Sequence, residues 1–132
     1  MTTKILIADD EPNSLISLEF LMRREGYEVH VARDGQEALD LLRRERPRLL
    51  LLDVMMPKKT GFEVCQEVRL DGVLKDTLIL MLSAKGRETD IVKGLALGAN
   101  VYMTKPYSTR ELADKVKALL AAAPPGAAAP GA

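Results

Sequence analysis

Leu-Leu-Leu-Leu-Asp at residues 49–53 is the stretch that decides the fold. A short, continuous apolar run with polar neighbours indicates a strand buried on both faces, as in a parallel sheet covered by helices. Ligands of open parallel sheets bind beyond the carboxyl ends of the strands, and Asp53 lies at such an end. Taken alone, however, an Asp in this position more often caps a helix or lies in a turn.

Strand-like runs alternate with amphipathic stretches along the rest of the chain. The expected strands are residues 4–8, 27–32, 48–53, 77–82 and 101–104, with a helical pattern after each. Strands and helices in alternation, joined by right-handed crossovers, form a parallel sheet with helices on both faces. The sequence therefore predicts an α/β fold with a doubly wound, five-stranded parallel sheet.

Several helix boundaries have signals of their own. Pro12 suits a first helical turn, and Gly26 and Gly98 suit helix ends. Two pairs have the spacing of a capping box, Asp34 with Glu37 and Ser108 with Glu111. These signals support helices in the intervals between the strands.

The composition is that of one ordinary globular domain, with 132 residues, 47% of them hydrophobic and 29% charged. Lys plus Arg and Asp plus Glu both number 19, so the basic excess typical of direct nucleic-acid binders is missing. No apolar stretch has the length of a membrane span and the N-terminus lacks a secretory signal, so we expect a cytoplasmic protein without a membrane partner. Cys65 is the only cysteine, which excludes an internal disulfide.

The C-terminal end has a different composition. Residues 121–132 contain only Ala, Pro and Gly, which have little to bury and much flexibility to lose on folding. We expect one domain over residues 1–121 and a disordered tail or truncated linker over residues 122–132.

Polar side chains follow four of the five expected strands. They are Asp9 and Asp10 after the first, Asp53 at the end of the third, Ser83 after the fourth and Lys105 after the fifth. Each has an ordinary alternative, since Asp10 could cap the next helix, Ser83 could lie in a turn and Lys105 could be a surface lysine. Because the carboxyl ends of parallel strands lie along one edge of the sheet, we expect all five side chains to form one site.

Such a site suits phosphoryl transfer. Three crowded carboxylates repel one another unless a cation lies between them, and an all-oxygen site with room for water and a phosphate oxygen suits Mg²⁺. Asp53 is the candidate nucleophile, while Asp9 and Asp10 would hold the metal. Lys105 would pair with one phosphoryl oxygen, and Ser83 would donate a hydrogen bond to another.

These residues closely resemble the receiver domains of response regulators in two-component signalling. The resemblance covers residues 4–120 and rests on an ordered set of motifs: Asp9-Asp10-Glu11-Pro12, Asp53 with Met56, Pro57 and Gly61, Ser83 with Ala84, and Lys105 with Pro106. It implies a flavodoxin-like fold with strand order 2-1-3-4-5, as in the chemotaxis receivers.

The resemblance also implies a function. A receiver accepts a phosphoryl group, here on Asp53, from a histidine kinase or phosphotransfer protein in a Mg²⁺-dependent reaction. Further implications are the Met55 backbone carbonyl as a metal ligand, a cis peptide before Pro106, and Tyr102 as an aromatic residue that switches together with Ser83. The surface of the fourth helix, fifth strand and fifth helix would then act on a downstream protein or a missing output domain. Such a switch is not an enzyme, because its only chemistry is its own phosphorylation and dephosphorylation.

Two positions depart from the common pattern of the family, and two others bear on the lifetime of the phosphoryl group. Thr60 and Asn100 stand where Asp is common, and neither position carries the chemistry. Met55 and Lys85 occupy the two positions that tune the lifetime of the phosphoryl group. Met55 has no group that could orient an attacking water, so we predict that its side chain does not accelerate hydrolysis.

Two features leave alternatives open. The first expected helix is more apolar than one covered face requires, at Leu15, Ile16, Leu18, Phe20, Leu21 and Met22. This set is either a wide buried stripe or, as the family resemblance suggests, partly a surface on which the kinase docks. His30 lies in the second strand pattern, away from the acidic edge, and we expect a packing or surface residue there rather than a phosphodonor.

The sequence leaves alternatives to a self-contained signalling switch. The chain could be a receiver module cut from a larger response regulator or hybrid kinase, to which the Ala, Pro and Gly tail points. A metal-dependent phosphatase or a flavin or nucleotide binder on a similar fold is a different class. The sequence disfavours a dinucleotide binder, which needs a glycine-rich loop after the first strand. That segment is occupied instead by Asp9, Asp10, Glu11 and Pro12.

Overall fold

The computed structural model describes residues 2–84 and 86–122 of the chain. Five strands and five helices alternate along it. In order they are β1 (Lys4–Ala8), α1 (Pro12–Arg24), β2 (Glu28–Ala32), α2 (Gly35–Glu45), β3 (Leu49–Asp53), α3 (Gly61–Leu70), β4 (Leu78–Ser83), α4 (Glu88–Ala96), β5 (Val101–Thr104) and α5 (Thr109–Ala122). The alternation predicted from the sequence is confirmed, with strand ends that differ by one residue at most.

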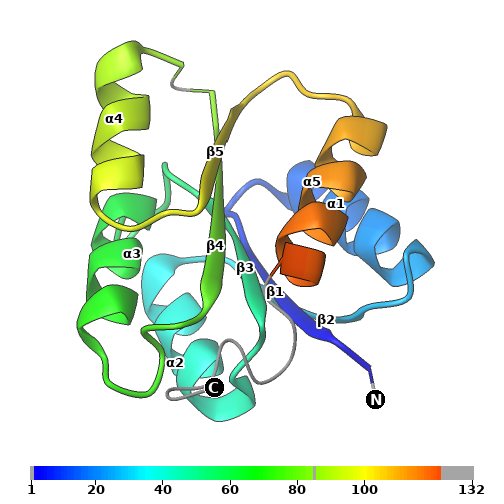
Figure 1. Cartoon of the computed structure of the whole chain (residues 1–132), viewed down its shortest axis with the longest axis horizontal. Coiled ribbons are helices and arrows are strands. Elements are labelled where there is room, and N and C mark those ends of the chain that lie inside the picture. The colour runs from blue at the N-terminus through cyan, green and yellow to red at the C-terminus, as the bar shows by residue number, and fades with distance from the viewer. Residues whose placement is uncertain (1, 85, 123–132) are drawn as a thin grey trace.

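The five strands form one parallel sheet in the order β2-β1-β3-β4-β5. Figure 1 shows α1 and α5 on one side of this sheet and α2, α3 and α4 on the other. The predicted doubly wound architecture and strand order are therefore confirmed. None of the helices among the described residues is long and apolar enough to cross a membrane.

The leucines of β3 belong to two hydrophobic cores. Successive side chains of a strand point to opposite faces, so Leu50 and Leu52 pack with α2 and α3, whereas Leu49 and Leu51 pack with α1 and α5. All four leucines have an exposed fraction of 0%. An uninterrupted apolar run is thus the pattern that a central strand with two covered faces requires, and it brings Asp53 to the edge of both cores.

Side chains cap four helices near the carboxyl edge of the sheet, among them α5, where Oγ of Ser108 accepts from the N–H of Glu111 at 2.9 Å as the spacing predicts. Glu11 caps α1 by accepting hydrogen bonds from the backbone N–H groups of Asn13 and Ser14, at 3.1 and 2.8 Å. Asp34 accepts from the N–H of Glu37 at 2.8 Å at the start of α2. These bonds satisfy N–H groups that have no partner inside the helix.

The ordinary alternative for Asp10, a helix cap, does not apply, since Glu11 caps α1 instead. The Asp34 and Glu37 pair caps α2 in one direction only, because the Glu37 carboxylate accepts from the N–H of Arg33 at 2.6 Å rather than from Asp34. A complete capping box occurs in α3, where Thr60 and Glu63 exchange bonds of 3.2 and 3.0 Å. Thr60, one of the departures from the family pattern, thus begins a helix.

Two boundaries bear on the predicted domain limits. Helix α5 ends at Ala122, so the first residue of the predicted tail is helical. The rest of that tail, residues 123–132, and Lys85 lie outside the described residues. Gly26 and Gly98 follow α1 and α4 with φ angles of 95° and 116°, a left-handed conformation that favours glycine and ends both helices.

Candidate functional site

Three carboxylates meet at the carboxyl edge of the sheet. Asp9 and Asp10 follow β1, Asp53 ends the neighbouring β3, and one oxygen atom of each lies within 4.8 Å of the others. Asp9 and Asp53 are buried, with exposed fractions of 1% and 7%, whereas Asp10 is exposed. The parallel pairing of β1 with β3 brings them together, because both strands end at the same edge.

The carboxylate of Asp9 is only partly satisfied. Its Oδ1 atom accepts a hydrogen bond from the N–H of Glu11 at 2.9 Å. Its buried Oδ2 atom accepts no hydrogen bond from the described residues, and the Nζ atom of Lys105 lies 3.6 Å away. A buried carboxylate oxygen that accepts no hydrogen bond fits a cation ligand, since an ion pair of this length compensates only part of its desolvation. The oxygen donors of Asp9, Asp10 and Asp53 suit Mg²⁺.

The environment of Asp53 opposes its ionisation. Burial raises the pKa of this carboxyl group to about 6, with help from the negative charges of Asp9 and Asp10. Lys105 and a hydrogen bond from the Met55 backbone act in the opposite direction and lower this pKa. The ionised form of Asp53 is therefore energetically unfavourable, and a bound cation would stabilise it.

The loop after β3 folds back onto the end of the strand. The N–H of Gly61 donates to the carbonyl of Val54 at 2.8 Å, and a Cβ atom on Gly61 would lie 2.8 Å from the Cα of Val54 and still closer to the Asp53 carbonyl. Only glycine allows this approach without a shift of the backbone. The side chain of Met55 is 52% exposed, so its contribution to the site is through its backbone.

Ser83 and Lys105 stand at the ends of the two strands beyond β3. Ser83 is fully buried at the end of β4, and its carbonyl accepts a hydrogen bond of 2.8 Å from the N–H of Lys105. The peptide between Lys105 and Pro106 is cis. The structure therefore brings the predicted hydroxyl and ammonium groups to the same edge as the carboxylates.

Two tyrosines lie beside these groups. Burial raises the pKa of the half-buried Tyr102, while a side-chain hydrogen bond with Ser83 lowers it. Burial also raises the pKa of Tyr107, and the charges of Asp9 and Asp53 add to this increase. The sequence analysis missed Tyr107. Its position two residues after Lys105 could have indicated it, since it directly follows Pro106 at the same edge.

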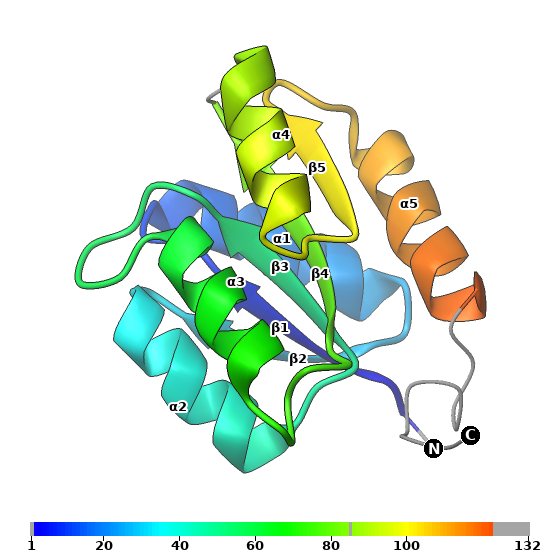
Figure 2. The ribbon, with the colours of Figure 1, turned by 60° about the vertical axis from the view of Figure 1, so that its left-hand side comes forward.

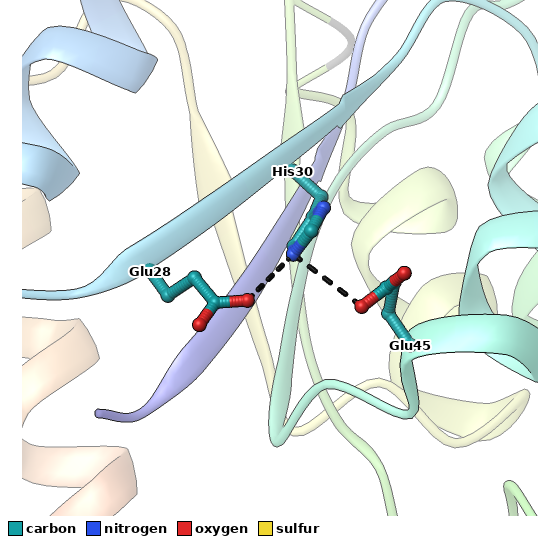
Figure 3. A group of neighbouring side chains, drawn as sticks. All are labelled: Glu28, His30 and Glu45. Carbon is teal, nitrogen blue, oxygen red and sulfur yellow. Dashed lines mark hydrogen bonds and ion pairs between the residues drawn. The ribbon is translucent and has the colours of Figure 1, made fainter. Parts of the chain in front are cut away.

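His30 belongs to a separate cluster near the beginning of the strands. Its Nε2 atom lies 2.8 Å from Oε2 of Glu28 and 3.6 Å from Oε1 of Glu45 (Figure 3). Lys4, at the start of β1, also pairs with Glu45 at 3.2 Å. Arg44 pairs with Glu45 as well, at 3.2 Å, so this cluster is an ion-pair network at the opposite edge of the sheet. The half-buried His30 is therefore a packing or surface residue, as expected.

The chain is similar to known receiver domains over most of its length. The family model for the response regulator receiver domain matches residues 5–117. A putative response regulator from Chloroflexus aurantiacus is 37% identical with a TM-score of 0.87, and the match covers 92% of this chain and 99% of that one. The receiver domain of a signal transduction histidine kinase from Syntrophus aciditrophicus is 31% identical, with a TM-score of 0.85 and coverage of 92% of each chain.

A chemotaxis response regulator also shares this structure. CheY4 of Vibrio cholerae is 32% identical with a TM-score of 0.85, over 91% of this chain and 100% of that one. The fold is therefore flavodoxin-like and of the kind found in chemotaxis receivers, as predicted. With its matched family and its acidic strand-end site, the chain belongs to the response regulator receiver domains of two-component signalling.

Proposed function

We propose that the protein is a switch that accepts a phosphoryl group on Asp53 in a Mg²⁺-dependent reaction. The observation that carries this proposal is the Oδ2 atom of buried Asp9, which accepts no hydrogen bond from the described residues and lies in one cluster with Asp10 and Asp53. The donor would be a phosphohistidine of a histidine kinase or of a phosphotransfer protein. The chain would act where ATP-dependent kinases work, in the cytoplasm.

The metal would be held by the carboxylates of Asp9, Asp10 and Asp53 together with the backbone carbonyl of Met55. When bound, Mg²⁺ neutralises the charge that develops on the phosphoryl oxygens. The raised pKa of Asp53, about 6 without metal, supports this role, because a cation at the carboxylates favours the ionised nucleophile.

The transfer exchanges one bond at phosphorus for another. A carboxylate oxygen of Asp53 attacks the phosphorus of the phosphohistidine, an O–P bond forms, and the N–P bond breaks. The leaving imidazole nitrogen takes up a proton. Lys105 would pair with a phosphoryl oxygen, and the Ser83 hydroxyl would turn to donate a hydrogen bond to another.

The turn of Ser83 would transmit the signal to Tyr102. These side chains interact in the unmodified protein, so a hydroxyl that bonds the phosphoryl group can no longer make the same bond. Tyr102 would move as a consequence, and with it the surface of α4, β5 and α5. That surface would bind a downstream protein, or an output domain if the chain is a module of a larger regulator or hybrid kinase.

Incubation with Mg²⁺ and acetyl phosphate tests this proposal. Intact-mass measurement should detect one added phosphoryl group on the native chain and none on Asp53→Asn. Asp40→Asn, at an exposed position of α2, should behave like the native chain. The adduct should be lost when EDTA is present from the start. An adduct that persists in Asp53→Asn refutes the assignment, and continuous turnover of phosphomonoesters would indicate a phosphatase instead.

A further inference from the structure

The aromatic ring of Tyr102 packs against the backbone of α4 at Gly94. Gly94 is buried, and a Cβ atom built on it would lie 2.8 Å from Cδ2 and 3.2 Å from Cε2 of Tyr102. Figure 2 shows α4 lying alongside β5, the strand that carries Tyr102. The ring therefore occupies space that is available only because position 94 has no side chain.

The face of α4 that meets Tyr102 has a second notable residue. Asp90 lies one turn before Gly94, is 8% exposed, and pairs with Nε of Arg87 at 3.1 Å. The charge of Asp90 contributes to the raised pKa of Tyr102, after burial, so this carboxylate lies near the phenol. At its hydroxyl end, Tyr102 bonds with Ser83. Helix α4 and the end of β4 thus hold the two ends of one aromatic side chain.

A side chain at position 94 would displace the Tyr102 ring from this arrangement. The added Cβ would also lie 2.8 Å from Sδ of Met81, which pairs with Tyr102 in the register of β4 and β5. A thioether can rotate away, since methionine has three rotatable side-chain bonds. The ring is rigid and moves as a whole, so displacing its Cδ2 edge also displaces the hydroxyl from Ser83.

We propose that Gly94 is a positioning residue of the phosphorylation switch, because its lack of a side chain lets the Tyr102 ring lie against α4 with its hydroxyl on Ser83. This inference rests on the proposed function. It assigns to α4 a part in setting the balance between the positions of Tyr102, in addition to its part in the output surface. The switch would then depend on a contact between α4 and β5 as well as on the carboxylates of the acidic site.

The packing is measured first, on the unmodified protein. NMR spectra should show nuclear Overhauser contacts between the Gly94 Hα protons and the Tyr102 ring protons, and these need no phosphorylation. In Gly94→Ala the Tyr102 ring resonances should shift, whereas in Gly72→Ala they should not. Gly72 is the matched control, since a Cβ atom there meets no described atom within 4 Å. Missing contacts between Gly94 and the ring would overturn the inference.

The coupling to the site is measured with beryllium fluoride, a phosphoryl mimic, in the presence of Mg²⁺. Gly94→Ala should change the affinity for this probe about threefold or more, and Gly72→Ala should leave it unchanged. In a Tyr102→Ala background the effect of Gly94→Ala should disappear, because the ring that transmits it is gone. An effect of equal size in that background would show that Gly94 acts only through helix packing, and would overturn the proposal.

The outcomes separate this inference from the proposed function. If the native chain does not bind beryllium fluoride and accepts no phosphoryl group, the proposed function is wrong and there is no switch for Gly94 to position. If the native chain does both but Gly94→Ala has the affinity of the native chain, only the role of Gly94 is wrong. Alanine is a better helix former than glycine, so the variant should fold, and its thermal unfolding checks this.

Discussion

At the scale of single residues, Asp53 combines its proposed role as nucleophile with a cost in stability. Its pKa of about 6 in the folded protein lies above 3.8, the ordinary pKa of an Asp side chain. The folded state therefore binds the proton more tightly than the unfolded state, and stability falls as the pH rises from about 4 to about 6. Above this window the ionised carboxylate lowers the free energy of unfolding by about 3 kcal/mol. An uncharged side chain at this position would not have this cost.

Asp53→Asn should consequently stabilise the metal-free protein at pH 7.5 by up to about 3 kcal/mol, and hardly at all at pH 4. Urea unfolding at both pH values, in EDTA, measures this difference. Mg²⁺ should reduce the advantage of the variant, because the cation stabilises the native carboxylate. An advantage that is the same at pH 4 and pH 7.5 would show that it does not arise from the charge of Asp53.

Met55 lies two residues after the proposed phosphoacceptor Asp53, and the prediction at this position concerns the lifetime of the phosphorylated state. Its exposed side chain has no polar group that could orient an attacking water. Met55→Asn should therefore shorten the phosphoryl half-life roughly tenfold, which is less than a general base contributes, because an amide can only orient the water. The decay of the adduct, followed by intact mass after removal of the donor, measures this half-life. Met55→Leu is the control and should keep the native half-life. An unchanged half-life in Met55→Asn would contradict the prediction.

Asn100 shows how a departure from the family pattern is accommodated. Its Oδ1 atom accepts hydrogen bonds from the N–H of Ile79 at 2.8 Å and from Nη2 of Arg69 at 3.0 Å. Arg69 also donates to the carbonyls of Gly98 and Thr77, at 2.9 and 2.6 Å. Asn100 thus ties α3, β4 and the start of β5 together, which is a structural role that no local sequence pattern could reveal.

Asn100→Asp should stabilise the protein by about 1 kcal/mol, because a charged acceptor strengthens the hydrogen bond to the Arg69 guanidinium. The change in urea midpoint measures this effect at neutral pH. In an Arg69→Met background the same substitution should lose its benefit. A stabilisation that persists without Arg69 would mean that another cation provides it.

At the scale of elements, the apolar set on α1 divides into two parts. Leu15, Leu18, Leu21 and Met22 are buried against the sheet. Ile16 and Phe20, one turn apart, are each 66% exposed. The wide buried stripe is therefore incorrect for these two residues, and they form an apolar patch that the fold leaves uncovered.

Phe20→Ser should slow phosphotransfer from a histidine kinase about tenfold, by analogy with the loss of a central aromatic contact in an interface. Phosphorylation by acetyl phosphate should be unchanged, because Phe20 is not part of the acidic site. Radiolabel transfer from phosphorylated kinase compares the two donors, with the exposed Val73, between α3 and β4, changed to Ser as control. Equal rates for native and variant chains with both donors would exclude a docking role for Phe20.

At the scale of the whole molecule, the alternation of patterns was sufficient to predict the layers of the fold. The unbroken leucines of β3 could predict a strand with two covered faces, because burial of both faces requires apolar residues at every position. The strand order could not be derived in the same way. It came from the resemblance to receiver domains, since several orders are compatible with alternating strands and helices.

The candidate site was predictable in its members but not in its energetics. The rule that strand ends share one edge was enough to group Asp9, Asp10 and Asp53, which the structure brings within 4.8 Å. Oδ2 of Asp9 accepts no hydrogen bond from the described residues, and the pKa of Asp53 is raised. Both properties depend on which atoms cover the two carboxylates, and those atoms come from distant parts of the chain. The contact of Gly94 with Tyr102 was missed for the same reason.

The sequence by itself determined the number and kind of the elements, the position of Asp53 at the end of a buried strand, and the residues that could join it. These features depend on near neighbours along the chain, where the period of apolar residues and the capping residues act. Only the tertiary structure decided how deeply Asp53 is buried, which part of α1 stays exposed, and what the Tyr102 ring lies against. Burial and contact are set by packing between segments that are far apart in the sequence, and local patterns carry no information about it.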